Sequence, residues 1–380
     1  MQYSKYGKTG MNVSAFGMGC MRLPQITTAS GKSEVDFDEV TKMVRYAVDH
    51  GVNYFDSAFT YHGGLSEAAL GRALKDGYRD KVMIATKQPL RVVKTEGDIR
   101  RNLETTLDRL GTDHLDVYFM HHMRPEIFDD VKRLHMPEWF QKFKDEGLVK
   151  AIGFSYHGNF KGFKEFLTFG DFDMCQIQQN LLDVENQATE KAIYLAEELG
   201  KACVIMEPLH GGGLSYAPPA VAALYDAFPV KRSPVEWAFR HLYNYSGIST
   251  ILSGVTTMEQ LADDIRIFEK AVPNCMNGAE KELIAKVRAA YSSREAVPCT
   301  GCKYCLPCPN GVFIPGVFEY YNAAVMMGKL DGPKGEYDFM CAEGIATPNC
   351  IECGVCETKC PQEIKIRDEL KKAHIFFNAE

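Results

Sequence analysis

Apolar and polar positions alternate along the first 290 residues in a pattern of short strands and longer amphipathic helices. Eight short runs rich in apolar and β-branched residues predict strands at 13–19, 53–58, 82–87, 115–121, 151–155, 174–179, 202–208 and 250–255. Between them a helical period recurs, as at 37–50, 96–110, 189–199 and 233–242. Strand–helix alternation repeated over about 250 residues predicts an α/β fold, a closed (β/α)8 TIM barrel.

A doubly wound parallel sheet is the alternative fold for such alternation. That fold, when it binds a dinucleotide, carries the pattern Gly-x-Gly-x-x-Gly after its first strand. The segment Gly17-Met18-Gly19 lacks the third glycine. The barrel is therefore preferred.

Cysteines change the picture after residue 290. The chain has 13 cysteines in 380 residues, and nine of them lie between Cys299 and Cys360. The other four are Cys20, Cys175, Cys203 and Cys275. Clustered thiols in a reducing compartment indicate metal binding rather than disulfides. We expect a domain boundary near residue 291, with a barrel domain at 1–290 and a cysteine-rich domain at 291–380.

Composition predicts a cytoplasmic protein. Hydrophobic residues make up 46% of the chain, charged residues 24%, and the net charge is −7. No apolar run approaches the roughly 18 residues that span a bilayer, and the N-terminus lacks the apolar stretch of a secretory signal. The absence of a basic excess argues against nucleic acid as a partner.

The C-terminal cysteines form an internal repeat. The run Cys299-x2-Cys302-x2-Cys305-x2-Cys308-Pro309 is followed by Cys350-x2-Cys353-x2-Cys356-x3-Cys360-Pro361, with the first three cysteines of each run offset by 51 residues. Zinc also uses Cys-x2-Cys pairs, but the second run has the spacing typical of bacterial ferredoxins. The repeat predicts two [4Fe–4S] clusters.

In two-cluster ferredoxins the fourth cysteine of each run binds the other cluster. That rule predicts one cluster on Cys299, Cys302, Cys305 and Cys360, and the other on Cys350, Cys353, Cys356 and Cys308. The long gap between the runs contains a helical segment at 317–327, which favours a mainly helical ferredoxin-like domain. Cys341, like the four cysteines before residue 290, is expected to be a buried thiol.

In a barrel, catalytic groups lie at the carboxyl ends of the strands. These ends carry Asp56, Lys87, His121, Ser155, Gln176 and Pro208. Tyr61 follows closely behind the first of them. These side chains include an acid, a base and a phenol, which are groups that can take part in proton transfer.

Several segments resemble those of the aldo-keto reductase family. The segments that carry the resemblance are MQYSKYGKTGMNVSAFGMGCMRL, FDSAFTYHGG, MIATK, LDVYFMHHMRP, IGFSYHG, CQIQQNLLD and VIMEPLHGGGL. They occur in the family's order over roughly residues 1–270. Together with the cysteine repeat, they make the chain similar to a subgroup with a C-terminal two-cluster ferredoxin-like domain.

The resemblance implies an NAD(P)-dependent oxidoreductase that interconverts a carbonyl and an alcohol. Tyr61 would donate the proton, although a phenol titrates near ~10. Lys87 would lower that pKa, and Asp56 would hold Lys87 charged. His121 would bind the carbonyl oxygen. His122 is expected at the substrate rim with Arg124, Tyr156 and Trp139, and these residues specify no particular carbonyl.

The resemblance also places the nicotinamide cofactor. Ser155 and Gln176 would hold the carboxamide, but the asparagine usual after that serine is Tyr156 here, and the ring-stacking tyrosine is Met206. The expected cofactor contacts are Gly19, Cys20, Met21, Asp56, Ser155, Gln176, Met206, Pro208, Leu209, Gly211, Gly213, Gly254, Thr256, Gln260, Asp263 and Asp264.

The last strand and helix bear on the choice of cofactor. Family members that prefer NADPH carry a lysine and an arginine there, and these positions are Gly254 and Gln260 in this chain. Asp263 and Asp264 nearby would repel a phosphate. We therefore expect NAD(H) to be slightly favoured over NADP(H), unless another loop supplies an arginine.

Three classes of function remain open. The first is a carbonyl reductase or alcohol dehydrogenase whose clusters are structural or auxiliary. The second is an electron-transfer enzyme, served by a redox partner protein, whose clusters exchange electrons with the barrel. The third is a redox or oxygen sensor on an inactive barrel. The set of Asp56, Tyr61, Lys87 and His121 argues against the third, and the lack of a flavin motif argues against the second.

Overall fold

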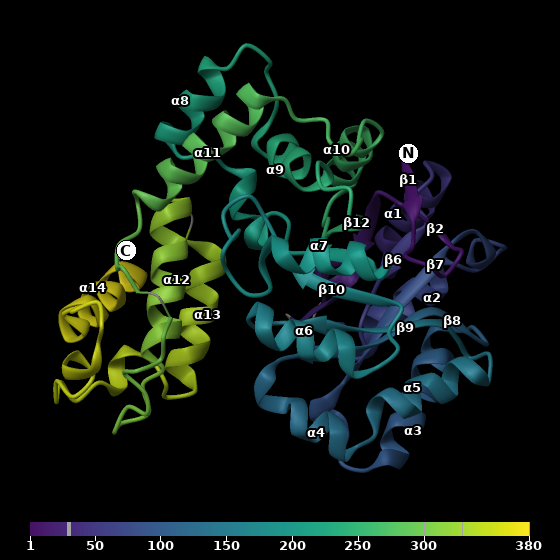
Figure 1. Cartoon of the computed structure of the whole chain (residues 1–380), viewed down its shortest axis with the longest axis horizontal. Helices are drawn as coiled ribbons and strands as arrows, with labels where there is room; N and C mark the ends of the chain where they lie inside the picture. The colour runs from purple at the N-terminus through teal and green to yellow at the C-terminus, as the bar shows by residue number, and fades with distance from the viewer. Residues whose placement is uncertain (29–31, 300, 329, 380) are drawn as a thin grey trace. The chain divides into compact units, whose positions relative to one another are not determined.

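The structure is a computed structural model that describes residues 1–28, 32–299, 301–328 and 330–379. Parallel strands form a closed barrel in which spatial neighbours follow chain order (Figure 1). They are β3 (Phe16–Gly19), β6 (Tyr54–Asp56), β7 (Met83–Pro89), β8 (Leu115–Met123), β9 (Val149–Tyr156), β10 (Met174–Gln178), β11 (Ala202–Met206) and β12 (Ile248–Ser253). The predicted (β/α)8 barrel is confirmed.

Helices follow the strands along the chain. They are α1 (Phe37–Asp49), α2 (Leu65–Ala73), α3 (Glu96–Leu110), α4 (Phe128–Arg133), α5 (Met136–Asp145), α6 (Phe160–Phe169), α7 (Thr189–Leu199), α9 (Pro234–Tyr243) and α10 (Met258–Phe268). Asp36 caps α1 by accepting hydrogen bonds from the backbone of Asp38 and Glu39. This cap sets where α1 begins after its loop.

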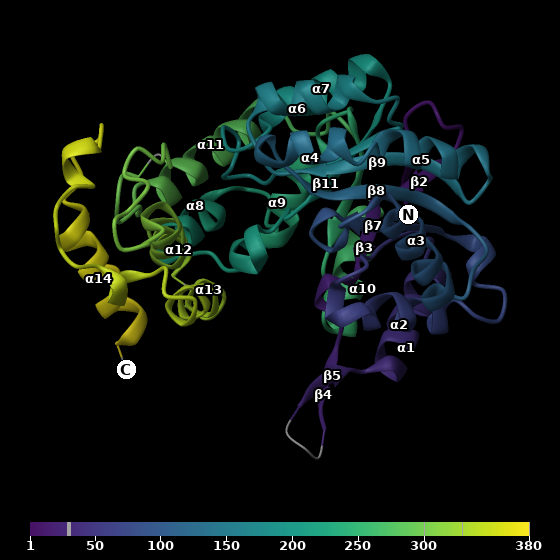
Figure 2. The ribbon, with the colours of Figure 1, turned by 90° about the horizontal axis from the view of Figure 1, so that it is seen from below.

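Two hairpins add to the barrel. Strands β1 (Tyr3–Lys5) and β2 (Asn12–Ser14) pair with each other, as do β4 (Gln25–Thr27) and β5 (Ser33–Val35), which project away from the barrel (Figure 2). The run 13–19, predicted as one strand, is therefore divided between β2 and β3. Sequence pattern alone did not separate them because Val13 and Phe16 are both fully buried.

The first hairpin closes the amino-terminal end of the barrel. Tyr6 and Val13 pack with Tyr54, Phe119 and the other inward-facing residues in one apolar cluster. The hydroxyls of Tyr6 and Tyr54 lie 3.2 Å apart. This apolar plug leaves the carboxyl ends of the strands as the polar end of the barrel.

The chain divides into two compact units. The first contains Met1–Leu209 and Glu236–Met276, and the second contains His210–Val235 and Asn277–Glu380. The helices of the second unit are α8 (Pro219–Ala227), α11 (Gly278–Ser292), α12 (Ile314–Met327), α13 (Asp331–Ala342) and α14 (Ile366–Asn378). The helix expected at 317–327 is thus present in α12, while the boundary expected near residue 291 stays a prediction.

A separate apolar core holds the second unit together. This core contains four residues that follow the two Cys-Pro pairs of the repeat: Val312, Ile314, Ile364 and Ile366.

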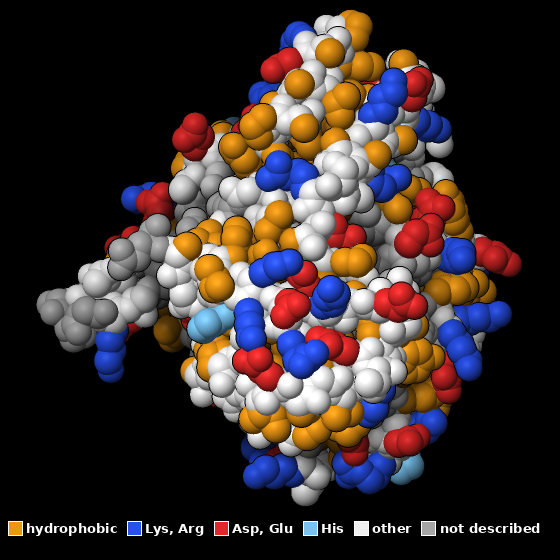
Figure 3. All heavy atoms as spheres, turned by 90° about the vertical axis from the view of Figure 1, so that its left-hand side faces the viewer, with side chains coloured by type: hydrophobic (Ala, Val, Ile, Leu, Met, Phe, Trp, Pro, Cys, Tyr) orange, Lys and Arg blue, Asp and Glu red, His pale blue; other side chains and the backbone are white. Residues whose placement is uncertain are grey.

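On the face seen in Figure 3, basic and acidic side chains are interspersed among hydrophobic ones. Within the described residues, no helix is both long enough and apolar enough to span a membrane.

Candidate functional site

Four of the predicted side chains lie together at the carboxyl end of the barrel. Lys87 of β7 is only 1% exposed, and its Nζ donates to Asp56 Oδ1 at 2.5 Å and to the carbonyl oxygen of Ser57 at 2.6 Å. The same ammonium lies 4.7 Å from the centroid of the Tyr61 ring. The rings of Tyr61 and His121 meet edge to face with centroids 5.8 Å apart. The structure therefore brings the expected tetrad together.

The electrostatics of these groups follow from burial and from the buried ion pair. Burial raises the pKa of Asp56, and the charge of Lys87 opposes this rise. Burial acts to lower the pKa of Lys87, but Asp56 and Tyr61 outweigh it, so the net direction is upward. Burial, followed by the charge of Lys87, lowers the pKa of His121 to about 2. At neutral pH the pair is ionised and His121 is neutral.

Tyr61 differs from the sequence-based expectation. Burial raises the pKa of its phenol, and the charge of Lys87 only partly offsets this effect. The net direction is upward, whereas the sequence predicted a lowered pKa. The phenol therefore stays protonated at neutral pH, which suits a group that must donate a proton.

Gln176 and Ser155 stand beside the tetrad as predicted, but both already hold protein groups. Gln176 Nε2 donates to Asp56 Oδ2 at 3.0 Å. Ser155, its register partner on β9, accepts a hydrogen bond at Oγ from the backbone N–H of His122 at 2.7 Å. The hydroxyl hydrogen of Ser155 remains available as a donor. Both side chains are thus held in place by hydrogen bonds within the site.

Two residues expected at the substrate rim lie elsewhere. Tyr156 is buried among the rings of Phe163 and Phe166, and its hydroxyl donates to the carbonyl oxygen of Asn159 at 3.1 Å. Trp139, on α5, donates from Nε1 to Glu96 at 2.9 Å. Strand alternation turns Tyr156 away from the mouth and toward α6. Helix packing places Trp139 between outer helices, also away from the mouth.

Gln178 is a polar residue of the site that the sequence interpretation missed. It lies on the same face of β10 as Gln176, two residues nearer the mouth. Its Nε2 donates to Asp183 at 2.6 Å, while its buried Oε1 has no hydrogen-bond partner among the described residues. Strand alternation starting from Gln176 would have found it.

The region after β12 differs in part from expectation. Asp263 is paired with Arg266 at 2.9 and 2.7 Å, and Asp264 is only 4% exposed. Burial raises the pKa of Asp264 to about 7. These carboxylates therefore do not present two free negative charges, because one is paired and the other is buried.

Gly254, Thr256 and Gln260 do form the loop and helix start that the sequence predicted. The backbone N–H of Thr256 donates to Gln260 Oε1 at 2.8 Å. Arg22 crosses this loop, since its Cβ, Cγ and Cδ lie 3.7–3.8 Å from where a Cβ on Gly254 would be. The sequence had not singled out Arg22, which comes from the loop after β3.

The remaining expected cofactor contacts are divided between the two units. Gly19 ends β3, Cys20 is fully buried and Met21 is 61% exposed. Met206, Pro208 and Leu209 follow along and after β11. Gly211 and Gly213 belong to the second unit. A Cβ on Gly213 would lie 2.9 Å from Met327 Cγ, so this glycine allows close packing on α12.

One predicted cluster site coincides with a cavity in the second unit. Cys308, Cys350, Cys353 and Cys356 all line it, together with apolar groups such as Val312 and Leu370. The set includes the fourth cysteine of the first run, as the crossed rule requires. Apolar walls with four thiols fit an iron–sulfur cluster, whose thiolates each bind a different iron.

The other predicted set is also assembled. Burial raises the pKa of the Cys299 thiol, and Cys302 and Cys360 are among the neighbours that add to the shift. Burial raises the pKa of Cys305 to about 11, with Cys299 and Cys302 nearby. Within the described residues no group of three or more His, Cys, Asp or Glu is close enough to hold a single metal ion. The cysteines that bind a [4Fe–4S] cluster lie farther apart than the ligands of a single metal ion, because each thiolate binds a different iron.

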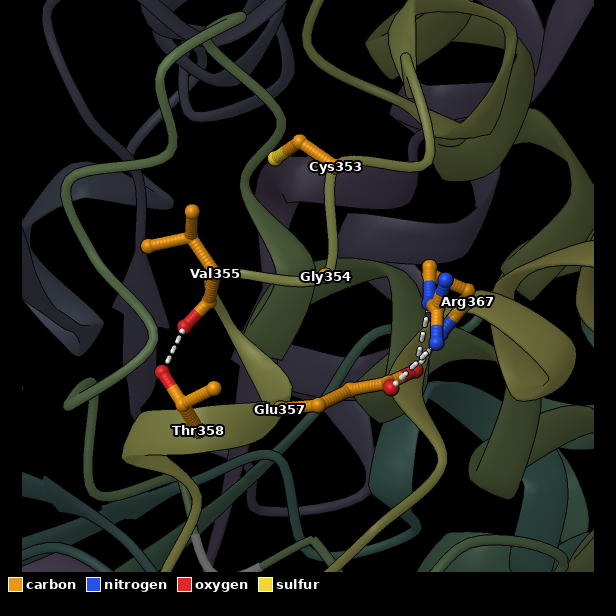
Figure 4. Close-up of a pocket in the computed structure, with 6 residues that line it drawn as sticks. All are labelled: Cys353, Gly354, Val355, Glu357, Thr358 and Arg367. Carbon is orange, nitrogen blue, oxygen red and sulfur yellow. Dashed lines mark hydrogen bonds and ion pairs between the residues drawn. The ribbon is translucent and has the colours of Figure 1, made fainter.

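An ion pair braces the loop that carries Cys353. Arg367 of α14 donates to both carboxylate oxygens of Glu357, at 3.1 and 2.9 Å, and Thr358 donates to the carbonyl oxygen of Val355 at 2.9 Å (Figure 4). Gly354 lies between Cys353 and Val355 and allows the loop to turn there, with φ at +74°. The bidentate pair fastens the cysteine loop to α14.

The cysteines outside the repeat divide into two groups. Cys20, Cys175 and Cys203 are buried, as expected. Cys275 and Cys341 are partly exposed, so the expectation of buried thiols was wrong for these two. They lie in or beside surface loops and helix ends, where sequence gave no burial signal.

Comparisons with known proteins agree with this arrangement. A model described as "Aldo/keto reductase family" matches residues 15–222, and one described as "4Fe-4S dicluster domain" matches residues 298–365. The "Uncharacterized oxidoreductase YrpG" of Bacillus subtilis (strain 168) is 31% identical over 240 residues, covering 56% of this chain and 68% of that protein.

A second relative and two solved structures extend the comparison. The "Probable aldo-keto reductase 1" of Glycine max is 30% identical over 224 residues, which span 56% of this chain and 60% of that protein. Aldo-keto reductase AKR11C1 of Bacillus halodurans superposes with a TM-score of 0.63 at 24% identity, covering 76% of this chain and 96% of that one. Aldo-keto reductase Tm1743 gives 0.60 at 20% identity, with 76% and 100% covered. These two structures support the fold alone.

Proposed function

Because the chain belongs to the aldo/keto reductase family, we propose that it interconverts a carbonyl and an alcohol by hydride transfer with a nicotinamide cofactor. The observation that carries the proposal is the buried Lys87–Asp56 pair against the ring of Tyr61, with His121 edge-on to the same ring. Its partner is a small-molecule carbonyl or alcohol. We also propose the cytoplasm as its compartment, since thiol ligands stay reduced there.

The chain's own residues supply the proton. Tyr61 donates it to the carbonyl oxygen as negative charge develops there. Lys87 stabilises the phenolate left behind, and Asp56 keeps Lys87 charged and oriented. Neutral His121 donates a hydrogen bond that positions the carbonyl oxygen. A bound nicotinamide supplies the hydride.

The residues near β9 and β10 fit the carboxamide of that cofactor. Ser155 offers a hydroxyl donor, and the unpartnered Oε1 of Gln178 offers an acceptor. Gln178 would thus provide the contact that Tyr156 cannot make. Gln176, tied to Asp56, orients the carboxylate.

We further propose that the domain at 291–380 holds two [4Fe–4S] clusters with the crossed ligand sets. Metal–thiolate bonds would supply much of the folding energy of this small domain. The clusters are then auxiliary to the barrel chemistry. Anaerobic purification followed by activity measurements with NADH, NADPH and a panel of carbonyls tests the whole proposal, and the absence of turnover with every carbonyl would contradict it.

We predict that NAD(H) binds at least as tightly as NADP(H), because Gly254 and Gln260 carry no charge for a 2′-phosphate. Titration of both cofactors by quenching of protein fluorescence measures this directly. A preference for NADPH of about tenfold, or 1.4 kcal/mol, would contradict the prediction. If Arg22→Gln then abolished that preference, Arg22 would be the cation that grips the phosphate.

We also predict that the clusters take no part in the hydride step. A nicotinamide gives up two electrons as one hydride, whereas a cluster accepts one electron at a time, and the sequence has no flavin motif to couple them. Under anaerobic conditions, excess NADH should produce no reduced-cluster EPR signal, while dithionite should. A signal with NADH at the rate of turnover would instead support the electron-transfer function.

A further inference from the structure

A row of rings leads away from Tyr61 across the carboxyl end of the barrel. His121 and His122 lie 6.4 Å apart between centroids at 79°, and His122 and His157 are stacked at 4.3 Å and 29°. His121 itself meets Tyr61 edge to face. The tetrad accounts for Tyr61 and His121. The stacked pair of His122 and His157 has no role in the proton transfer.

The backbone fixes this row in place. The register between β8 and β9 shifts between Met120 and Met123, and His122 adopts φ of +64° within the shift. Its backbone N–H donates to Ser155 Oγ at 2.7 Å, while the N–H of His157 donates to the carbonyl oxygen of Met123 at 2.7 Å. A bulge with a strained, non-glycine residue at a strand end is typical of a functional site.

Two arginines lie near the ring of His122, and one of them, Arg124, also lies near the ring of His157. Pro89 is the register partner of His121, so Arg91 follows immediately in the turn η4 (Leu90–Val92). Burial is the main cause that lowers the pKa of His122, and the charges of Arg124 and Arg91 add to it. Burial also lowers the pKa of His157 to about 3, with Arg124 contributing. Both arginines are therefore close enough to the rings to act on them.

Negative charge does not balance these cations. Asp56 is held by Lys87, and Glu126 lies 3.9 Å from Arg124 in a pair with both side chains largely in solvent. An ion pair that is exposed in this way contributes little free energy. Arg91 has no ion-pair partner among the residues that the structure describes. Arg91 and Arg124 therefore place positive charge beside the neutral rings of His122 and His157.

We propose that the substrate of this active site carries an anionic group, a carboxylate or a phosphate, apart from its reacting carbonyl. Arg91 and Arg124 bind this anion beside the stacked rings of His122 and His157, while the carbonyl lies against Tyr61 and His121. The anion is unchanged in the reaction: the carbonyl carbon gains the hydride and its oxygen gains the proton of Tyr61. This inference rests on the proposed function and narrows its substrate class.

Matched pairs of substrates test the inference. We would measure kcat/KM for para-carboxybenzaldehyde against para-carbamoylbenzaldehyde, and for glyceraldehyde 3-phosphate against glyceraldehyde. We expect the charged member of at least one pair to be favoured about tenfold or more, and the pair that shows it identifies carboxylate or phosphate. Arg91→Gln and Arg124→Gln should each reduce that ratio, because kcat/KM falls more for the charged member of the pair than for the uncharged one.

Lys150→Gln provides the matched control. Lys150 lies near the amino-terminal end of β9, 2.8 Å from Asp116, so its loss removes a positive charge at the opposite end of the barrel. The ratio should not change in this variant. Equal kcat/KM for both members of both pairs, or a preference that survives both arginine variants, would overturn the inference.

A binding experiment separates this inference from the proposed function. Benzoate and benzamide, which cannot be reduced at a carbonyl by this chemistry, would be titrated into the protein by calorimetry. Benzoate should bind more tightly than benzamide, and the arginine variants should remove the difference. If benzoate behaves so and no carbonyl is reduced, the proposed function fails while the anion site stands. If carbonyls are reduced but benzoate shows no advantage, a carboxylate-binding site is excluded, and equal kcat/KM for the phosphate pair would then overturn the inference altogether.

Discussion

Replacement of Tyr61 by phenylalanine should lower kcat about 100-fold or more, the range for loss of a general acid. The variant keeps the ring that meets His121 edge to face and lies 4.7 Å from Lys87, so the packing of the site is retained. Only the hydroxyl is lost. Because burial raises the pKa of Tyr61, the wild-type phenol is protonated throughout the neutral range, and the loss should be seen at every pH there.

The control for this prediction is Tyr194→Phe. Tyr194 lies on α7 and is 53% exposed, so the loss of its hydroxyl should leave kcat unchanged. Binding of the nicotinamide to Tyr61→Phe, followed by fluorescence quenching, should also be close to that of the wild-type protein. Near-normal turnover in Tyr61→Phe would remove this residue from the mechanism.

The tetrad was predictable from sequence because a parallel barrel gathers strand ends at one edge. Asp56, Lys87 and His121 lie far apart in the chain, but each follows a recognisable apolar run. Strand periodicity therefore determined which side chains meet, without knowledge of any contact distance. The crossed cysteine sets stay a prediction, taken from the ligand arrangement of two-cluster ferredoxins.

Features that depend on a single shift of register were not predictable. The bulge in β8 turns His122 toward His157, and nothing in the local pattern of β8 signals it. A shift of one residue moves a side chain to the other face of a strand. The burial of Tyr156 against α6 and of Asp264 on the inner side of α10 likewise depends on how helices pack on the barrel.

The positions of two arginines at the mouth of the barrel were also not predictable from the sequence. Arg22 and Arg91 stand in loops, where sequence offers neither periodicity nor direction for a side chain. Their positions beside Gly254 and His121 follow from strand register and loop path. We propose Arg91 as a ligand of the substrate anion and test Arg22 as a ligand of the cofactor phosphate, and both proposals needed the geometry of the site.

The crossed assignment of the cluster ligands predicts unequal outcomes for two double variants of equal size. Cys308 and Cys353 line one cavity, so Cys308→Ala with Cys353→Ala should remove one cluster and spare the other. Cys308→Ala with Cys302→Ala should remove both, because Cys302 lies with the thiols of Cys299 and Cys305. Iron analysis should give about four irons per chain in the first variant and almost none in the second.

An uncrossed arrangement would reverse this result. Cys308 would then share a cluster with Cys302, so the pair Cys302 and Cys308 would spare one cluster and the pair Cys308 and Cys353 would destroy both. Each double variant loses two thiols of the same cysteine repeat, so a general effect on folding would lower iron in both. Cys341→Ala serves as the control, because this partly exposed thiol lies outside the repeat, and it should retain about eight irons per chain. The contrast between the two double variants, rather than the loss in either one, therefore decides how the clusters are held.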